Sequence, residues 1–214
     1  MKREEISIPL ASVTLKGELV LPENALGIVV FSHGSGSSRF SPRNKMVAEL
    51  IQQHGMGTLL FDLLTEQEDR IYENRFNIDL LVSRLIEATE WLMNNKETQK
   101  YPVAYFGAST GAASALRAAA YFEKKIKAVV SRGGRPDLAL KALPMVTAPT
   151  LLIVGQLDVP VIQMNKQAFD QLHCIKEMKI IPGATHLFEE PGKLIEVAEM
   201  AISWYKEYFV KQGN

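Results

Sequence analysis

The residues best suited to chemistry in this sequence surround Ser109, which lies in the stretch GASTG at residues 107–111. A G-x-S-x-G pattern between a strand and a helix is typical of a nucleophilic serine, because small flanking residues permit a sharp turn that exposes the hydroxyl. With 14 glycines among 214 residues the pattern also arises by chance in some chains, so the flanking sequence must support it. The apolar VAYF precedes it and the helix-favouring AASALRAAA follows. The alternative is that Ser109 only caps that helix.

A serine hydroxyl is a weak nucleophile unless a histidine base and an orienting acid assist it. His186 is the predicted base, because it lies between the last predicted strand and the last predicted helix, although an ordinary loop histidine would fit the same position. Asp158 follows the preceding strand and is the predicted acid, with helix capping as its alternative role. Asp62, which also follows a predicted strand, is the reserve candidate for the acid.

Charge that develops on a substrate carbonyl oxygen needs donors aimed at it. We expect one donor to be the backbone N–H of Thr110, directly after the candidate nucleophile. The second is expected from the glycine-rich stretch HGSGSS after the first buried strand, at the N–H of Ser35. His33, in the same stretch, is interpreted as ordering this loop and not as the base.

Four arginines are expected near the same edge of the sheet. Arg39 and Arg43 follow the glycine-rich loop, and Arg132 and Arg135 follow a later strand. Because a planar guanidinium suits a carboxylate or phosphate, Arg39 and Arg132 are possible contacts to an anionic substrate. The alternative is that these arginines form structural ion pairs with carboxylates at Glu66, Glu68, Asp69 or Asp137.

Short apolar runs that alternate with segments of helical period must position these residues. Residues 6–21 alternate in polarity and predict one or two antiparallel edge strands. The buried strands are predicted at Gly27–Ser32, Gly57–Phe61, Val103–Phe106, Ala128–Ser131, Thr150–Val154 and Glu177–Ile181. Apolar helix faces are predicted at Met46, Val47, Leu50 and Ile51, and within residues 78–92 and 194–209.

This order of elements predicts an α/β fold in which helices cover both faces of a doubly wound, mostly parallel sheet. We expect one domain over residues 1–214. Ligands of such sheets bind at the carboxyl ends of the strands, where all the candidate residues above lie. About 18 residues connect the strand that ends at Ser131 to the one that begins at Thr150, which leaves room for one short helix and for no cap domain.

Composition excludes several classes of function. The formal net charge is zero and no polybasic run is present, which argues against a nucleic-acid partner. Apolar runs are far shorter than the roughly 20 residues of a membrane helix, so no membrane association is expected. The N-terminus has no signal-peptide pattern, and the single cysteine, Cys174, forms no internal disulfide, so a cytoplasmic location is predicted. No cluster has metal-ligand spacing, and no metal or cofactor is expected.

The whole set of motifs resembles the α/β-hydrolase superfamily and, within it, the small dienelactone-hydrolase-like hydrolases. The similarity runs through HGSGSS, GASTGA, SRGGRPD, GQLD and GATHLF. The stretches HGSGSSR and SRGGRPDLA are similar to a subgroup sometimes joined to a phosphoribosyltransferase domain, which we do not expect within these 214 residues. Dienelactone hydrolase itself uses a cysteine, so dienelactone is not the expected substrate.

The resemblance implies a cofactor-independent hydrolase that uses Ser109, Asp158 and His186. We therefore expect a serine hydrolase that cleaves a small soluble carboxylic ester through an acyl-enzyme. The alternatives are a thioesterase or another acyl hydrolase with the same triad, or a non-catalytic ligand receptor with this fold.

Overall fold

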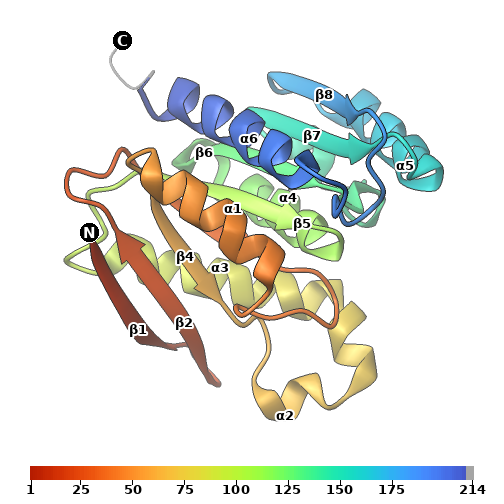
Figure 1. The fold of residues 1–214 in the computed structure, drawn as a ribbon. Coiled ribbons are helices and arrows are strands. Elements are labelled where there is room, and N and C mark those ends of the chain that lie inside the picture. Colours follow the sequence, from red (N-terminus) through yellow and green to blue (C-terminus); the bar gives the residue numbers. More distant parts are fainter. Residues whose placement is uncertain (211–214) are drawn as a thin grey trace.

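Eight strands form one sheet in a computed structural model that describes residues 1–210 (Figure 1). The strand order is β1-β2-β4-β3-β5-β6-β7-β8. The antiparallel β1 and β2 lie at one edge, β2 pairs antiparallel with β4, and all further pairs are parallel. The strands are β1 (Lys2–Pro9), β2 (Thr14–Leu21), β3 (Ile28–Ser32), β4 (Gly57–Phe61), β5 (Val103–Ala108), β6 (Ile126–Arg132), β7 (Thr150–Gly155) and β8 (Lys176–Ile181).

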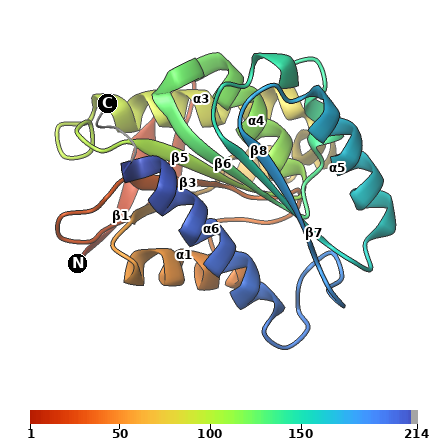
Figure 2. The ribbon, with the colours of Figure 1, turned by 90° about the horizontal axis from the view of Figure 1, so that it is seen from above.

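Helices cover both faces of this sheet (Figure 2). Helices α1 and α6 pack on one face, and α3, α4 and α5 pack on the other. The helices are α1 (Pro42–Gln53), α2 (Glu66–Asp69), α3 (Ile78–Asn94), α4 (Thr110–Phe122), α5 (Val159–Gln171) and α6 (Lys193–Val210). Short 3-10 helices are η1 (Tyr72–Phe76), η2 (Glu123–Lys125), η3 (Pro136–Ala139) and η4 (Leu143–Met145). The predicted doubly wound α/β fold is confirmed.

The central strands consist of apolar runs because both of their faces are covered. Every residue of β3, β4, β5 and β7 is buried. Each face therefore has its own core, and Tyr105 of β5 and Tyr205 of α6 belong to opposite cores. The Tyr205 hydroxyl donates to the Tyr105 carbonyl oxygen at 2.8 Å, which ties α6 to the middle of the sheet.

Three local predictions differ from the structure. The first edge strand begins at Lys2 and not at Ile6, because an edge strand tolerates the charged side chains of residues 2–5 on exposed positions. Met46 was predicted in the apolar face of α1 but is 37 % exposed, while Asn44 and Gln52 are buried there. The segment that holds α2 and η1 was not predicted as helical.

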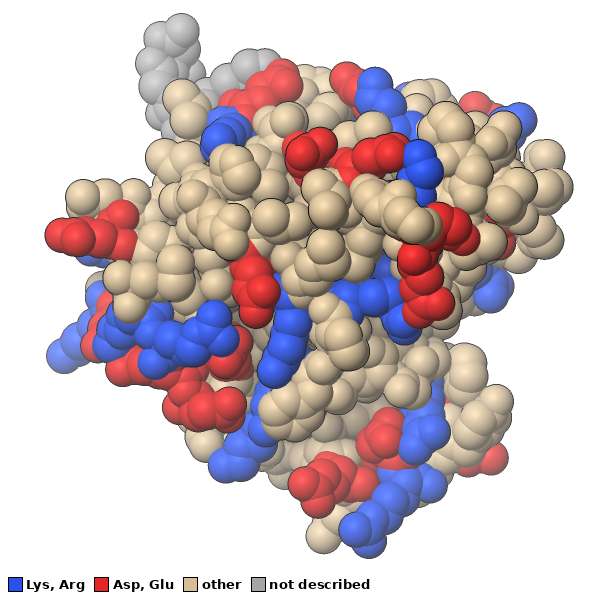
Figure 3. Space-filling view, in the orientation of Figure 1, with Lys and Arg blue, Asp and Glu red and all other residues tan. Residues whose placement is uncertain are grey.

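The connection between β6 and β7 contains only the short helices η3 and η4. It forms no cap over the carboxyl ends of the strands, as predicted, although two 3-10 turns take the place of one short helix. Acidic and basic side chains are interspersed over the face seen in Figure 3, as expected at zero net charge. None of the described helices is long and apolar enough to cross a membrane.

Candidate active site

Ser109 occupies a strained turn between β5 and α4. Its φ is 52° and its ψ is −123°, a conformation that costs a non-glycine residue about 1–3 kcal/mol. Backbone hydrogen bonds hold the turn: the Ser109 N–H donates to the Arg132 carbonyl oxygen (3.2 Å), and the Ser109 carbonyl oxygen accepts from the N–H groups of Ala112 (3.1 Å) and Arg135 (3.0 Å). The Ser109 side chain makes no capping hydrogen bond to α4. The capping alternative for Ser109 is therefore wrong.

The two glycines of the turn are required for different contacts. A Cβ at Gly107 would lie 2.5 Å from Cα of Ala112, so this glycine permits the sharp turn, as predicted. A Cβ at Gly111 would lie 2.1 Å from the carbonyl oxygen of Ser32, at the end of β3. Gly111 thus lets α4 approach the neighbouring strand, and its carbonyl oxygen would lie 2.8 Å from a Cβ at Gly107, across the turn.

His186 and Asp158 are joined by a hydrogen bond. His186 Nδ1 lies 2.6 Å from Asp158 Oδ2, and the two side chains are 38 % and 13 % exposed. Asp158 directly precedes α5 but makes no capping bond to it, so its carboxylate is directed to the histidine. Gly133, with a φ of 52°, lies against His186: a Cβ there would be 3.1 Å from the His186 carbonyl oxygen and 3.5 Å from its ring.

Ser109 and His186 line the same cavity, which has a volume of about 190 Å³. No hydrogen bond joins their side chains in the described part of the chain; such bonds often tighten only when a substrate binds. The lining also includes Arg43, Asn44 and Arg132, and of these only Arg132 was proposed from the sequence as a substrate contact. Asn44 was missed because its neighbours in SPRN indicate only a helix start, through Ser41 and Pro42.

The predicted oxyanion donors lie side by side, but one of them is already engaged. The Ser35 N–H donates to Thr110 Oγ1 at 2.8 Å, in contrast to the free N–H that the sequence led us to expect. Thr110 is the first residue of α4, and N–H groups in the first turn of a helix lack acceptors within the helix. Gly34 brings the loop close to Ser109, because a Cβ there would be 3.1 Å from Ser109 Cβ.

His33 fixes the shape of this loop. Its Nε2 accepts from the Leu63 N–H (3.1 Å), so Nδ1 carries the proton and donates to the Gly34 carbonyl oxygen (3.0 Å). Burial lowers the pKa of His33 below its usual value, which favours this neutral form. These contacts agree with the interpretation of His33 as a residue that orders the loop.

The structure separates the two arginines that were considered for substrate binding. Arg39 pairs with Asp62 through its guanidinium and its backbone N–H, and the latter bond is 2.8 Å long. It lines a cavity that shares Ser37 with the one that holds Ser109, so its contact to a substrate stays a prediction, and the ion pair supports a structural role. Asp62 is likewise removed as a candidate acid, because its carboxylate binds Arg39 and Asp158 holds His186.

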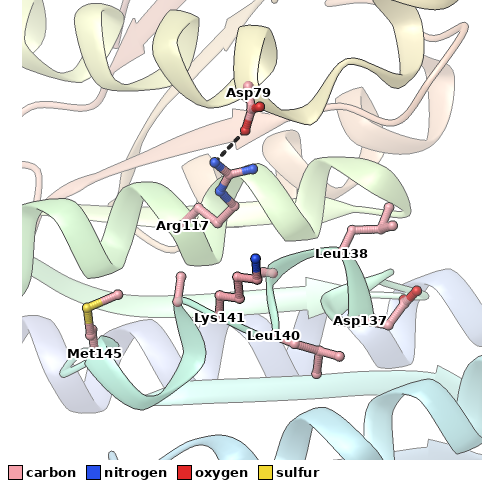
Figure 4. A pocket seen from close by; sticks show the side chains of 9 residues that line it. Asp79, Arg117, Asp137, Leu138, Leu140, Lys141 and Met145 are labelled. Carbon is pink, nitrogen blue, oxygen red and sulfur yellow. Dashed lines mark hydrogen bonds and ion pairs between the residues drawn. The ribbon is translucent and has the colours of Figure 1, made fainter.

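A larger hollow of about 670 Å³ lies on the opposite face of the sheet from α1, between α3, α4 and the β6–β7 connection (Figure 4). Arg117 and Asp79 face each other there in an ion pair of 2.6 Å. The candidate residues Ser109, His186 and Asp158 do not line this hollow. Within residues 1–210 no group of three His, Cys, Asp or Glu side chains is arranged to hold a metal ion.

Comparisons with known proteins agree with this architecture. The dienelactone hydrolase family model matches residues 15–210. The crystal structure of a dienelactone hydrolase from Anabaena variabilis is 56 % identical, covers 97 % of this chain and 98 % of its own, and superposes with a TM-score of 0.94. Est1E from Butyrivibrio proteoclasticus, at 16 % identity and a TM-score of 0.80 over 97 % of this chain and 99 % of its own, has the same fold.

A Mycobacterium tuberculosis protein with the provisional name phosphoribosyl transferase is 50 % identical over 213 residues. That match covers 100 % of this chain and 48 % of the relative, so the chain spans about half the length of the curated relatives it matches. The family match extends over most of the chain, and the Anabaena protein is similar over nearly its whole length. The chain therefore belongs to the dienelactone hydrolase family, whose members are hydrolases of the α/β fold.

Proposed function

We propose that this chain is a serine hydrolase that cleaves a small carboxylic ester through an acyl-enzyme. The observation that carries the proposal is the 2.6 Å bond between Asp158 and His186 at the cavity that Ser109 lines. The proposed nucleophile, base and acid follow the carboxyl ends of β5, β8 and β7, which supports the proposal.

In the proposed reaction His186 takes the proton of the Ser109 hydroxyl as its oxygen attacks the ester carbonyl. Asp158 holds the imidazole in the correct tautomer and stabilises the imidazolium that forms. The imidazolium then gives its proton to the leaving alcohol. Water, with His186 again as base, attacks the acyl-enzyme and releases the carboxylic acid and free Ser109.

The tetrahedral oxyanion is proposed to bind the N–H of Thr110 and the N–H of Ser35. Without a substrate, the Ser35 N–H donates to Thr110 Oγ1. In the proposed reaction the oxyanion replaces the Thr110 hydroxyl as the acceptor of this N–H. A charged oxygen is a stronger acceptor than a neutral hydroxyl, which favours the exchange. One lost donor of this kind costs about 10²–10³ in kcat.

The size of the cavity favours small substrates. Its volume of about 190 Å³ is below the range of roughly 300–1,000 Å³ that is common for drug-sized ligands. The β6–β7 connection adds no cap that would enclose a long acyl chain. Short acyl esters fit this site, and thioesters of the same size are the alternative substrates.

The first test is the rate of 4-nitrophenyl acetate hydrolysis by Ser109→Ala. The variant is expected to lose at least about 10⁴-fold in kcat, because it lacks the proposed nucleophile. Ser203→Ala is the matched control, since Ser203 is exposed on α6 and its hydroxyl donates to the Glu199 carbonyl oxygen, away from the cavity of Ser109. Activity in Ser109→Ala close to that of the control would end the proposal.

A fluorophosphonate probe separates an enzyme from a receptor with the same fold. An activated serine reacts with it covalently, whereas an ordinary hydroxyl does not. Labelling is expected in the wild type and in Ser203→Ala, and is expected to disappear in Ser109→Ala and to slow in His186→Gln. An unlabelled wild-type protein that still binds esters would support the receptor alternative.

A further inference from the structure

We propose that Arg132 is the centre of a subsite for an anionic group, a carboxylate or a phosphate, on the substrate. The proposal rests on the proposed hydrolase function, because the same cavity holds Ser109 and His186. It names the substrate class more closely: a short ester with an anion a few bonds from the carbonyl that is cleaved.

The position of Arg132 brings its charge next to the nucleophile. Arg132 ends β6 and is paired in register with Ala108, the residue before Ser109. Its carbonyl oxygen accepts the Ser109 N–H, so a backbone hydrogen bond joins the two residues. Ala128 and Val130 pack with α1 and α6, and alternation along a strand puts Arg132 on that same face. Its side chain lines the cavity there.

The guanidinium of Arg132 is buried and has no counter-ion in the described part of the chain. The residue is 7 % exposed, and its Nε and Nη1 have no hydrogen-bond partner among residues 1–210. The other arginines near this edge are paired: Arg39 with Asp62, Arg43 with Glu189 and Arg135 with Asp137. A buried charge without a partner is costly, and a planar guanidinium is the side chain that matches a carboxylate or phosphate best.

The surroundings strengthen the positive potential of the cavity. Arg43 of α1 adds a second guanidinium to the lining, and although it pairs with Glu189, its Nε has no partner within the described chain. Burial, and to a smaller extent the charge of Arg43, lowers the pKa of Arg132 to about 10. Arg132 therefore stays charged at pH 7. Basic side chains gather in a hollow near the middle of the face in Figure 3.

Asn44 supplies a further polar group at the same place. It is 3 % exposed, lines the cavity and has a side-chain oxygen without a partner in the part of the chain that the structure describes. Unsatisfied donors and an unsatisfied acceptor within one cavity are expected where a polar ligand completes the hydrogen bonds. A carboxylate would use the donors of Arg132, and a protonated phosphate would in addition offer a proton to Asn44.

The test compares two esters of similar size, 4-nitrophenyl hemisuccinate and the neutral 4-nitrophenyl levulinate. Arg132→Gln is expected to lower the ratio of their kcat/KM values by about 10- to 100-fold, the range for a lost hydrogen bond to a charged group. Arg132→Lys should retain part of the ratio. Arg117→Gln is the matched control, because Arg117 lies in the hollow of Figure 4, and its ratio should equal that of the wild type. An equal loss for both esters in Arg132→Gln would overturn the proposal.

A binding measurement separates this inference from the proposed reaction. Ser109→Ala protein is titrated with succinate and with inorganic phosphate, and each anion that binds at Arg132 should raise the Tm. Adding Arg132→Gln should abolish the rise, and the two anions show whether carboxylate or phosphate fits better. Anion binding without ester hydrolysis would end the hydrolase proposal and leave the subsite standing.

A separate set of results would refute the anion subsite without refuting the hydrolase proposal. If esters are hydrolysed but neither anion raises the Tm, and the ester ratio is the same in Arg132→Gln and the wild type, the subsite is refuted. Should Arg132→Gln not fold, inhibition of wild-type levulinate ester hydrolysis by succinate or phosphate provides the same answer. Competitive inhibition supports the subsite, and its absence at tens of millimolar refutes it.

Discussion

Helices α1 to α5 all begin after a residue whose side chain is able to cap a helix, yet their first turns divide into two groups. At α1, α2 and α3 the side chains of Ser41, Thr65 and Asn77 accept a backbone N–H of the first turn. At α4 and α5 the side chains of Ser109 and Asp158 form no such bond. The same residue types at the same position are therefore used in two different ways.

The difference lies in where the free oxygen points. Asp158 binds His186, and Ser109 lines the cavity beside that histidine. Leaving α4 uncapped also keeps its first N–H groups and the positive end of its dipole next to the Ser109 hydroxyl. Capping stabilises a helix, whereas its absence at these two helices leaves both side chains and the donors of α4 available for chemistry.

The largest effect is expected at Asp158. Asp158→Asn should lower kcat by about 10⁴-fold, because the amide favours the wrong tautomer of His186. The Tm should change little, since no cap is lost. Kinetics with 4-nitrophenyl acetate and thermal unfolding measure the two effects. Asp170→Asn, at an exposed position near the other end of α5, is the control. A lower Tm with unchanged kcat would show that Asp158 acts as an ordinary cap and would contradict the division of the helices into two groups.

Asn77 should show the opposite pattern. Asn77→Ala removes the acceptor of the Leu80 N–H and is expected to lower the free energy of unfolding by about 1 kcal/mol. For a chain of this length that is a fall in Tm of about 2–4 °C. Urea unfolding and ester kinetics are the measurements, with kcat/KM expected within about twofold of the wild type. A large loss of activity at full stability would contradict the division into two groups.

The smallest effects are expected from glycine substitutions at Ser109, which does not cap its helix, and at Asn77, which does. Ser109→Gly relieves the strain of the positive φ but adds chain entropy to the unfolded state, and we expect a net rise of about 0.5–1 kcal/mol in the free energy of unfolding. Asn77→Gly should instead lower it by a few tenths of a kcal/mol. Urea unfolding of both variants measures whether the free energy of unfolding rises or falls. A marked loss of stability in Ser109→Gly would mean that the serine side chain supports the turn.

The parts of the fold that local pattern determines were predictable. The buried strands consist of apolar runs, and the predicted starts of those at Gly57, Val103 and Thr150 agree with the structure. Ser109 could be identified as the candidate nucleophile because the residues on both sides indicate a strand, a turn and a helix within ten positions. The meeting of Asp158 with His186 followed from the rule that the carboxyl ends of parallel strands share one edge.

What could not be predicted depends on contacts between distant loops. Arg39 pairs with Asp62 across 23 residues, and nothing in either stretch selects that partner over the nearby Glu66 or Asp69. The direction of the Ser35 N–H toward Thr110 depends on the rotation of one peptide group, which residue types do not encode. Arg132 was predicted directly after a strand, but its lack of a counter-ion among residues 1–210 appears only when all neighbouring elements are in place.

The short β6–β7 connection has a consequence for the kinetics of the proposed reaction. With only η3 and η4 between the strands, this connection has no lid that would have to open before products leave or water enters. Turnover of activated esters would then be limited by the breakdown of the acyl-enzyme and not by a conformational step. Small alcohols in the medium would reach the same intermediate as water does, so transesterification would compete with hydrolysis in proportion to their concentration.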